Sequence, residues 1–125
     1  MIKPLHWMGN SRETLKKFPD PVRREIGFGL GRAQEGGKYV HAKPLKGFGG
    51  AGVLEIISDF DGDTFRAIYT VRFAKAVYTL HCFQKKSKHG IETPKSEIES
   101  IRRRLKLAEQ DYKEKYEKET QNAEN

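Results

Sequence analysis

The chain has 125 residues, of which 36% are hydrophobic and 33% charged, so it fits one soluble globular domain with a single modest core. No stretch approaches the ~18 apolar residues of a membrane span, and no basic-then-apolar start resembles a signal peptide, so we expect no membrane partner. The only cysteine, Cys82, excludes an internal disulfide and a cysteine-based metal cluster, and it favours a reducing cytoplasm.

The positive charge of the chain is unevenly distributed. The formal net charge is +7, yet from Glu109 onward three lysines accompany six acidic residues, which leaves −3 on this end and +10 on residues 1–108. Such an excess favours a polyanionic partner such as nucleic acid, although solubility alone also accounts for a basic surface.

The first half of the chain predicts a strand and two helices. Residues 2–8 form the strand, and Asn10 with Glu13 has the spacing of a capping box that begins a short helix ending near Pro19. Asp20 and Pro21 begin a second helix, which ends at Gly36-Gly37. This helix contains three internal glycines that weaken it in isolation, so we expect it to depend on close packing: Gly27, Gly29 and Gly31.

The second half predicts a loop, three strands and a helix. Residues 43–52 are a basic, glycine-rich loop, and strands follow over residues 53–57, 65–73 and 76–83, with a hairpin turn at Asp61-Gly62. Thr93 caps the last helix, with Pro94 behind it. Its apolar residues recur at spacings of three and four, a stripe that must pack against an apolar surface: Ile98, Ile101, Leu105, Ala108 and Tyr112.

The element order β-α-α-β-β-β-α predicts a small α+β domain with an antiparallel sheet packed against helices. We assign residues 1–118 to this domain. Residues 119–125 contain no large apolar side chain, and we expect them to be a disordered tail.

Two patterns suggest a bound cofactor or metal but lack the necessary context. Residues 47–52 match the spacing G-x-G-x-x-G, yet they precede a strand instead of opening a helix, so we reject a dinucleotide site. This loop is either flexible or a contact to RNA phosphates through Lys43 and Lys46. The four histidines lack the spacing and the cysteine partners of a metal site, so we expect neither metal nor cofactor.

Candidate catalytic side chains lie in and after the predicted strands. Arg66 is either a solvated cross-strand partner or a bidentate phosphate ligand. Strand alternation places His81 on the less apolar, open side of its strand, either for proton transfer or as a packed residue. The last strand leads into a cationic turn beside a helix N-terminus that favours anions: Lys85, Lys86 and Lys88. Of the three arginines that spread around the last helix, Arg103 is taken as an RNA contact.

Four segments resemble the phage-derived, HigB-like branch of the RelE/ParE/HigB toxin superfamily. They are Leu54-Glu55-Ile56, Phe65-Arg66-Ala67-Ile68-Tyr69, Tyr78 to Ser87 and Thr93 to Ile98, and the most specific part is the run F-x-K-K-S…T-P-x-x-E-I. The resemblance covers roughly residues 1–108. It implies a small α+β fold and a toxin of a type II toxin–antitoxin system, whose cognate antitoxin often carries a helix-turn-helix domain.

The resemblance further implies an mRNA interferase, a metal-independent endoribonuclease that cuts mRNA on the ribosome. Arg66 falls where RelE-type nucleases hold an arginine, and Lys86, with Lys85 beside it, falls near a basic residue that steadies the phosphate. For proton transfer we favour His81, provided that its side chain points toward the groove, and Glu55 is the second candidate for the general base. Two other classes also stay open, a nucleic-acid-binding module without catalytic activity and a ParE-like gyrase poison.

Overall fold

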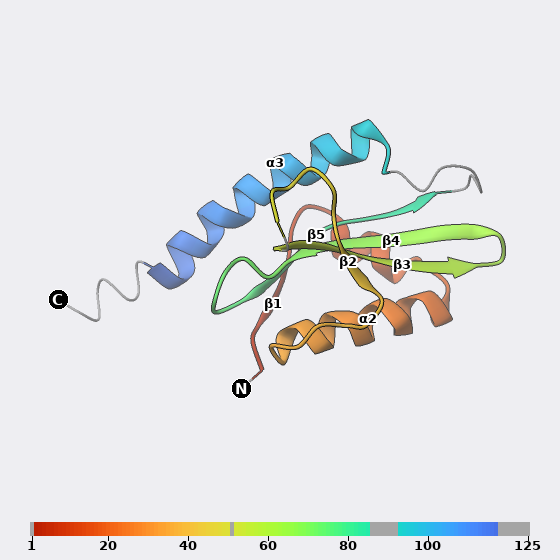
Figure 1. Ribbon diagram of the computed structural model, residues 1–125, viewed down its shortest axis with the longest axis horizontal. Helices are drawn as coiled ribbons and strands as arrows, with labels where there is room; N and C mark the ends of the chain where they lie inside the picture. Colours follow the sequence, from red (N-terminus) through yellow and green to blue (C-terminus); the bar gives the residue numbers. More distant parts are fainter. Residues whose placement is uncertain (1, 51, 86–92, 118–125) are drawn as a thin grey trace.

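A computed structural model describes residues 2–50, 52–85 and 93–117 of the protein. Its five-stranded sheet has the order β1-β5-β4-β3-β2, with helices on both faces (Figure 1). The strands are β1 (Leu5–Trp7), β2 (Ala42–Pro44), β3 (Val53–Phe60), β4 (Asp63–Thr70) and β5 (Val77–Lys85). The helices are α1 (Ser11–Lys16), α2 (Asp20–Gln34) and α3 (Lys95–Tyr112), and α3 continues into a short π-helix, η1 (Lys113–Glu117). The predicted α+β class is confirmed.

The sheet is mixed, whereas the sequence predicted an antiparallel one. Strands β3, β4 and β5 form the predicted antiparallel meander, and the turn between β3 and β4 uses positive φ angles at Asp61 (51°) and Gly62 (84°). The outer strand β1, however, runs parallel to β5. On the other edge β2 pairs antiparallel with β3, so the loop predicted from Lys43 onward in fact begins with a strand. This strand has three residues, one of them a proline, and is too short to show the alternation that identifies strands in a sequence.

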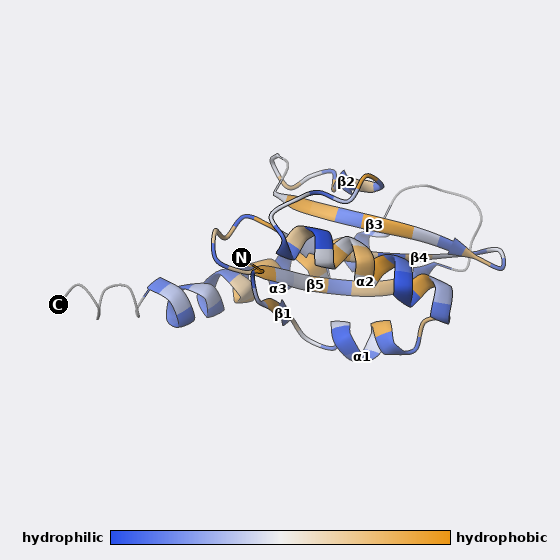
Figure 2. Ribbon diagram, turned by 90° about the horizontal axis from the view of Figure 1, so that it is seen from below, coloured by the Kyte–Doolittle hydropathy of each residue, from blue (hydrophilic) through white to orange (hydrophobic). Residues whose placement is uncertain are grey.

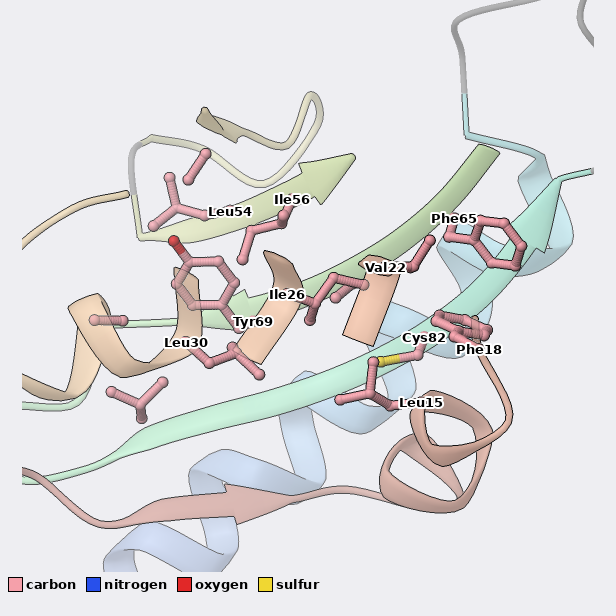
Figure 3. Close-up of a cluster of buried hydrophobic side chains, with 14 residues drawn as sticks. Leu15, Phe18, Val22, Ile26, Leu30, Leu54, Ile56, Phe65, Tyr69 and Cys82 are labelled. Carbon is pink, nitrogen blue, oxygen red and sulfur yellow. The ribbon is translucent and has the colours of Figure 1, made fainter. Parts of the chain in front are cut away.

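One face of the sheet is covered by α1 and α2. Their apolar residues pack against those of β3, β4 and β5 around Ile26, Ile56 and Tyr69 (Figure 3). The close packing expected for α2 occurs at Gly29, because a Cβ there would lie 2.5 Å from Ile56 Cδ1. Gly27 and Gly31 lie next to open space and have no such role.

The opposite face of the sheet is covered by α3. Ile101, Ala108 and Tyr112 are buried there, and Ile98 and Leu105 pack against the same cluster, as the predicted stripe requires. The last part of α3 and η1 project beyond the sheet and are mostly hydrophilic (Figure 2). Asn10 occupies the N-cap of α1 as predicted, but its side chain accepts a hydrogen bond from Arg104 and makes none to the helix. Pro94 occupies the N-cap position of α3 that was expected for Thr93.

A β-bulge in β5 changes which residues share a face. Tyr69 pairs with Thr79 and Ile68 pairs with His81, so Leu80 is the extra residue. Past the bulge the alternation resumes with His81 on the α3 face and Cys82 in the cluster under α1 and α2. The predicted faces of β5 are therefore wrong beyond Leu80. His81 does not lie on an open side of the sheet, because α3 covers it.

Three predictions concern residues outside the described ranges: the roles of Lys86 and Lys88, and the tail over residues 119–125. Within the described ranges, no helix is long and apolar enough to cross a membrane.

Candidate nucleic-acid site

A cavity of about 470 Å³ lies where β2 and β3 meet the beginning of α3. Its polar lining consists of Lys43, Lys46, Glu55 and Thr93. Its apolar lining consists of Pro44, Leu45 and Ile98. Lys43 and Lys46, the two lysines predicted to contact RNA in this region, both line the cavity. Glu55, one of the two candidate general bases, lines it as well.

Glu55 and Arg66 form an ion pair beside this cavity. The Nη1 atom of Arg66 lies 3.4 Å from Oε2 of Glu55 and donates a hydrogen bond to Oγ1 of Thr93 over 3.2 Å. The side chains are 3% and 12% exposed for Arg66 and Glu55, respectively. Arg66 is therefore a buried cation between the sheet and the residues that lead into α3, not a solvated cross-strand partner.

The register of the sheet aligns the polar residues in rows on the α3 face. One row runs across four strands through Lys43, Glu55, Ile68 and His81. The next row contains Arg66, opposite Phe83. Because neighbouring strands are about 4.8 Å apart, the Glu55 and His81 backbones are about 10 Å apart, with Ile68 between them.

Lys85 belongs to the third row of this face. It pairs with Thr64, two residues beyond the row of Arg66, and the pleat returns side chains two residues apart to the same face. Arg66 thus lies between the row that contains Glu55 and the row that contains Lys85. The structure brings together Arg66, Glu55, Lys43 and Lys46, with Lys85 on the same face.

The environment of Glu55 shifts the pKa of its carboxyl group. Burial raises the pKa of Glu55 from its ordinary value of 4.5, and the charges of Arg66 and Lys43 oppose this rise. A carboxyl group with a raised pKa is a better proton acceptor than an ordinary glutamate once it is ionised, as a general base requires.

His81 is held by two partners of opposite charge on α3. Arg104 Nη1 donates to His81 Nδ1 over 2.7 Å, so the proton of the neutral ring is on Nε2, which donates to Glu97. Burial lowers the pKa of His81 below 6.5, and this outweighs the effect of Glu97. Arg104 also donates to the carbonyl of the bulged Leu80 and to Asn10 Oδ1. Both ring nitrogens of His81 are thus engaged away from the cavity.

The glycine-rich loop is fastened on its outer side by two arginines. Arg102 of α3 donates to the Gly47 carbonyl over 3.0 Å, and its guanidinium carbon lies 4.6 Å above the Phe48 ring. Arg72, which follows β4, donates to the carbonyl of Phe48. Phe48 itself is buried in the α3 cluster. The part of the loop around Gly47 and Phe48 is therefore attached both to α3 and to the segment after β4.

The sequence did not identify three features of this site. The pairing of Lys43 with Glu55 depends on β2, which has no pattern of its own. The role of Thr93 as a partner of Arg66 was concealed by its position before Pro94, which is typical of a helix cap. Arg104 was treated only as one of three consecutive arginines, although its contact with His81 marks the inward side of α3.

Arg103, the arginine predicted to contact RNA, is exposed. Among the described residues, no group of three or more His, Cys, Asp or Glu side chains is placed to hold a metal ion.

Comparison with solved structures shows which class of fold this is. A free-state structure of a mutant of the E. coli toxin RelE, with two arginines replaced by alanine, is similar over 70% of this chain and 86% of that chain. The TM-score is 0.51 and the identity 18%, so the likeness shows the fold, that of a RelE-type toxin. The family model described as "Phage derived protein Gp49-like (DUF891)" matches residues 13–106, and the chain belongs to this family. No curated protein matches the chain. The predicted resemblance to a phage-derived, RelE-type branch is confirmed.

Proposed function

We propose that the protein is the toxin of a type II toxin–antitoxin system and that it cuts mRNA on the ribosome without a metal ion. The observation that carries this proposal is the buried Glu55–Arg66 pair beside a cavity lined by Lys43 and Lys46. The family and the fold support the class of toxin. The arrangement of these four residues supports the nuclease activity.

The proposed reaction is attack of the ribose 2′-oxygen on the neighbouring phosphorus. Glu55 removes the proton of the 2′-hydroxyl, the 2′-oxygen bonds to phosphorus, and the bond from phosphorus to the 5′-oxygen breaks. Arg66 stabilises the extra negative charge on the phosphorane by charge-assisted hydrogen bonds. We assign protonation of the leaving 5′-oxygen to Lys85, since Arg66 lies between the rows of Glu55 and Lys85 and an in-line displacement needs base and acid on opposite sides. The products are a 2′,3′-cyclic phosphate and a 5′-hydroxyl.

Glu55 is preferred to His81 as the general base for a geometric reason. Glu55 lines the cavity, whereas the two nitrogens of His81 are occupied by Arg104 and Glu97. In this proposal His81 fixes the first turns of α3 against β5. Lys86, the other lysine that the resemblance implicates, and Lys88 keep their proposed roles as phosphate contacts. The partners are the ribosome, mRNA and a cognate antitoxin of the helix-turn-helix type, and the site of action is the cytoplasm.

The proposal is tested by expressing the chain without an antitoxin and pulse-labelling proteins and DNA. Protein synthesis should fall first, and mRNA isolated from ribosomes should carry new 5′-hydroxyl ends within codons. Purified ribosomes programmed with one mRNA should give the same ends, and free mRNA should not. Earlier loss of DNA synthesis would overturn the nuclease proposal in favour of gyrase poisoning. Tight binding to ribosomes without any cleavage would instead favour a binding module.

A further inference from the structure

A second hollow lies beside the first, on the other side of the glycine-rich loop. It measures about 350 Å³ and is lined by Gly47, Phe48, Arg72, Arg102, Leu105 and Lys106. Leu45 and Lys46 line the first cavity, whereas Gly47 and Phe48 line the second, so the loop separates the two. On α3 the border falls between Ile98 and Arg102, which are about 6 Å apart along the helix axis.

The second hollow gathers three cations without a compensating carboxylate. Arg72, Arg102 and Lys106 come from two separate parts of the chain, the segment after β4 and the helix α3. None of the three forms an ion pair within the described part of the chain, and no acidic residue lines the hollow. Converging like charges oppose folding, so their arrangement at one place indicates an anionic ligand.

The backbone of the hollow is adapted to the arginines. A Cβ at Gly52 would lie 3.1 Å from Arg72 Nε and closer still to Cγ of the same side chain, so glycine lets this arginine reach the Phe48 carbonyl. Gly47 has a φ of 90°, and a Cβ there would lie 3.3 Å from Arg102 Nη2. Each arginine uses one nitrogen on a loop carbonyl, and a guanidinium has five N–H groups. N–H donors of both Arg72 and Arg102 therefore remain available to a ligand.

We propose that Arg72, Arg102 and Lys106 form a phosphate subsite for the nucleotide next to the one in the Glu55 cavity. The two hollows are about one helical turn apart, a spacing that matches successive phosphates of single-stranded RNA. The glycine-rich loop forms the ridge between them. This subsite rests on the proposed function, because it assumes that the ligand of the first cavity is RNA. The ligand class is a sugar-phosphate backbone, recognised by charge and not by base identity.

The test uses Lys106, whose replacement removes a charge without removing a contact to the loop. Binding of a fluorescein-labelled hexanucleotide with 2′-O-methyl groups, which cannot be cleaved, is measured by anisotropy over a series of salt concentrations with the full chain. Lys106→Ala should weaken binding about fivefold at low salt, or about 1 kcal/mol. It should also reduce the slope of log K against log salt by about 0.7, the value for one phosphate of a single strand. Lys16→Ala, on α1 across the sheet, is the control for an equal loss of net charge.

A labelled dinucleotide separates the two hollows, since it fills the first cavity alone and should bind Lys106→Ala and the parent equally. Equal effects of Lys106→Ala and Lys16→Ala on the hexanucleotide would overturn the subsite, and so would failure of the parent to bind it. Ribosome-dependent cleavage by the parent would in that case leave the proposed function intact. If Lys106→Ala selectively weakened hexanucleotide binding but the parent cut no mRNA on ribosomes, the subsite would hold and the nuclease proposal would fail.

Discussion

Glu55 and Arg66 pair diagonally across two antiparallel strands. Glu55 lies directly opposite Ile68, and Arg66 lies directly opposite Ile57, yet the carboxylate and the guanidinium meet 3.4 Å apart. The diagonal directs both side chains toward Thr93 and the start of α3. In a direct cross-strand pair, the two groups would extend side by side. Here the ion pair instead connects the sheet with the helix that covers it.

Replacement of Glu55 by glutamine should abolish cleavage and preserve the fold. Glutamine keeps an oxygen that accepts from Arg66, but it cannot take a proton from the 2′-hydroxyl. We expect ribosome-dependent cleavage to fall at least ~100-fold, the lower end for loss of a general base. Cleavage rates on programmed ribosomes measure this. Glu99→Gln, an exposed change on α3, is the control, and a Glu55→Gln protein that cuts at the parent rate would show that another residue is the base.

Removal of Arg66 should cost stability as well as activity. Arg66→Ala leaves the Glu55 carboxylate buried without its cation, and breaking a buried pair in this way typically costs about 3–5 kcal/mol. Urea unfolding should show this loss. The double variant Glu55→Gln/Arg66→Met removes both charges and should recover part of it. A double variant less stable than Arg66→Ala would contradict the pair as described.

The pH dependence of cleavage should report the raised pKa of Glu55. The base is the carboxylate, so activity rises with pH through a window above the ordinary glutamate value of 4.5. Lys43 holds the pKa of Glu55 down, so Lys43→Ala should move this acidic limb to higher pH. Lys46→Ala is the matched control, because it removes a lysine of the same cavity that is not among the causes of the Glu55 pKa shift. Rate profiles with equal shifts for both variants would argue against Glu55 as the titrating group.

The two sides of α3 should respond oppositely to added negative charge. Ile101 is completely buried, so Ile101→Asp places an unpaired carboxylate in an apolar contact and should unfold the domain, as thermal denaturation would show. Arg103 is exposed, so Arg103→Glu should keep the melting temperature and weaken binding to ribosomes, more strongly at low salt. A folded Ile101→Asp protein would mean that α3 faces the sheet differently.

The sequence predicted the parts of the fold that have long, regular patterns. The β3–β5 meander, α2 and the apolar stripe of α3 each extend over several residues, and each was found. The resemblance led us to propose Arg66 as a catalytic residue, and Glu55 was the second candidate for the general base. Their burial was not predictable, because it depends on α3 covering the face to which they point.

Three features of the fold could not be predicted from the sequence, because they depend on contacts between residues far apart in the chain. The bulge at Leu80 adds one residue to β5 and reverses the faces of all that follow, and the letters Leu-His-Cys contain no sign of it. The strand β2 exists only through its pairing with β3. The parallel pairing of β1 with β5 connects residues about 70 positions apart, which no local pattern specifies.

The position of β1 also sets the order in which the protein can be completed during its own synthesis. Within the described residues, β1 pairs with β5 alone, and the other strands of the sheet all precede β5 in the chain. The cavity beside Glu55 additionally needs Thr93 and Ile98, which are made later still. A nascent chain therefore has an unfinished sheet and no cavity until β5 and the start of α3 have emerged. Under the proposed function, the chain cannot cut mRNA during that interval, and a cognate antitoxin can bind it before the site is complete.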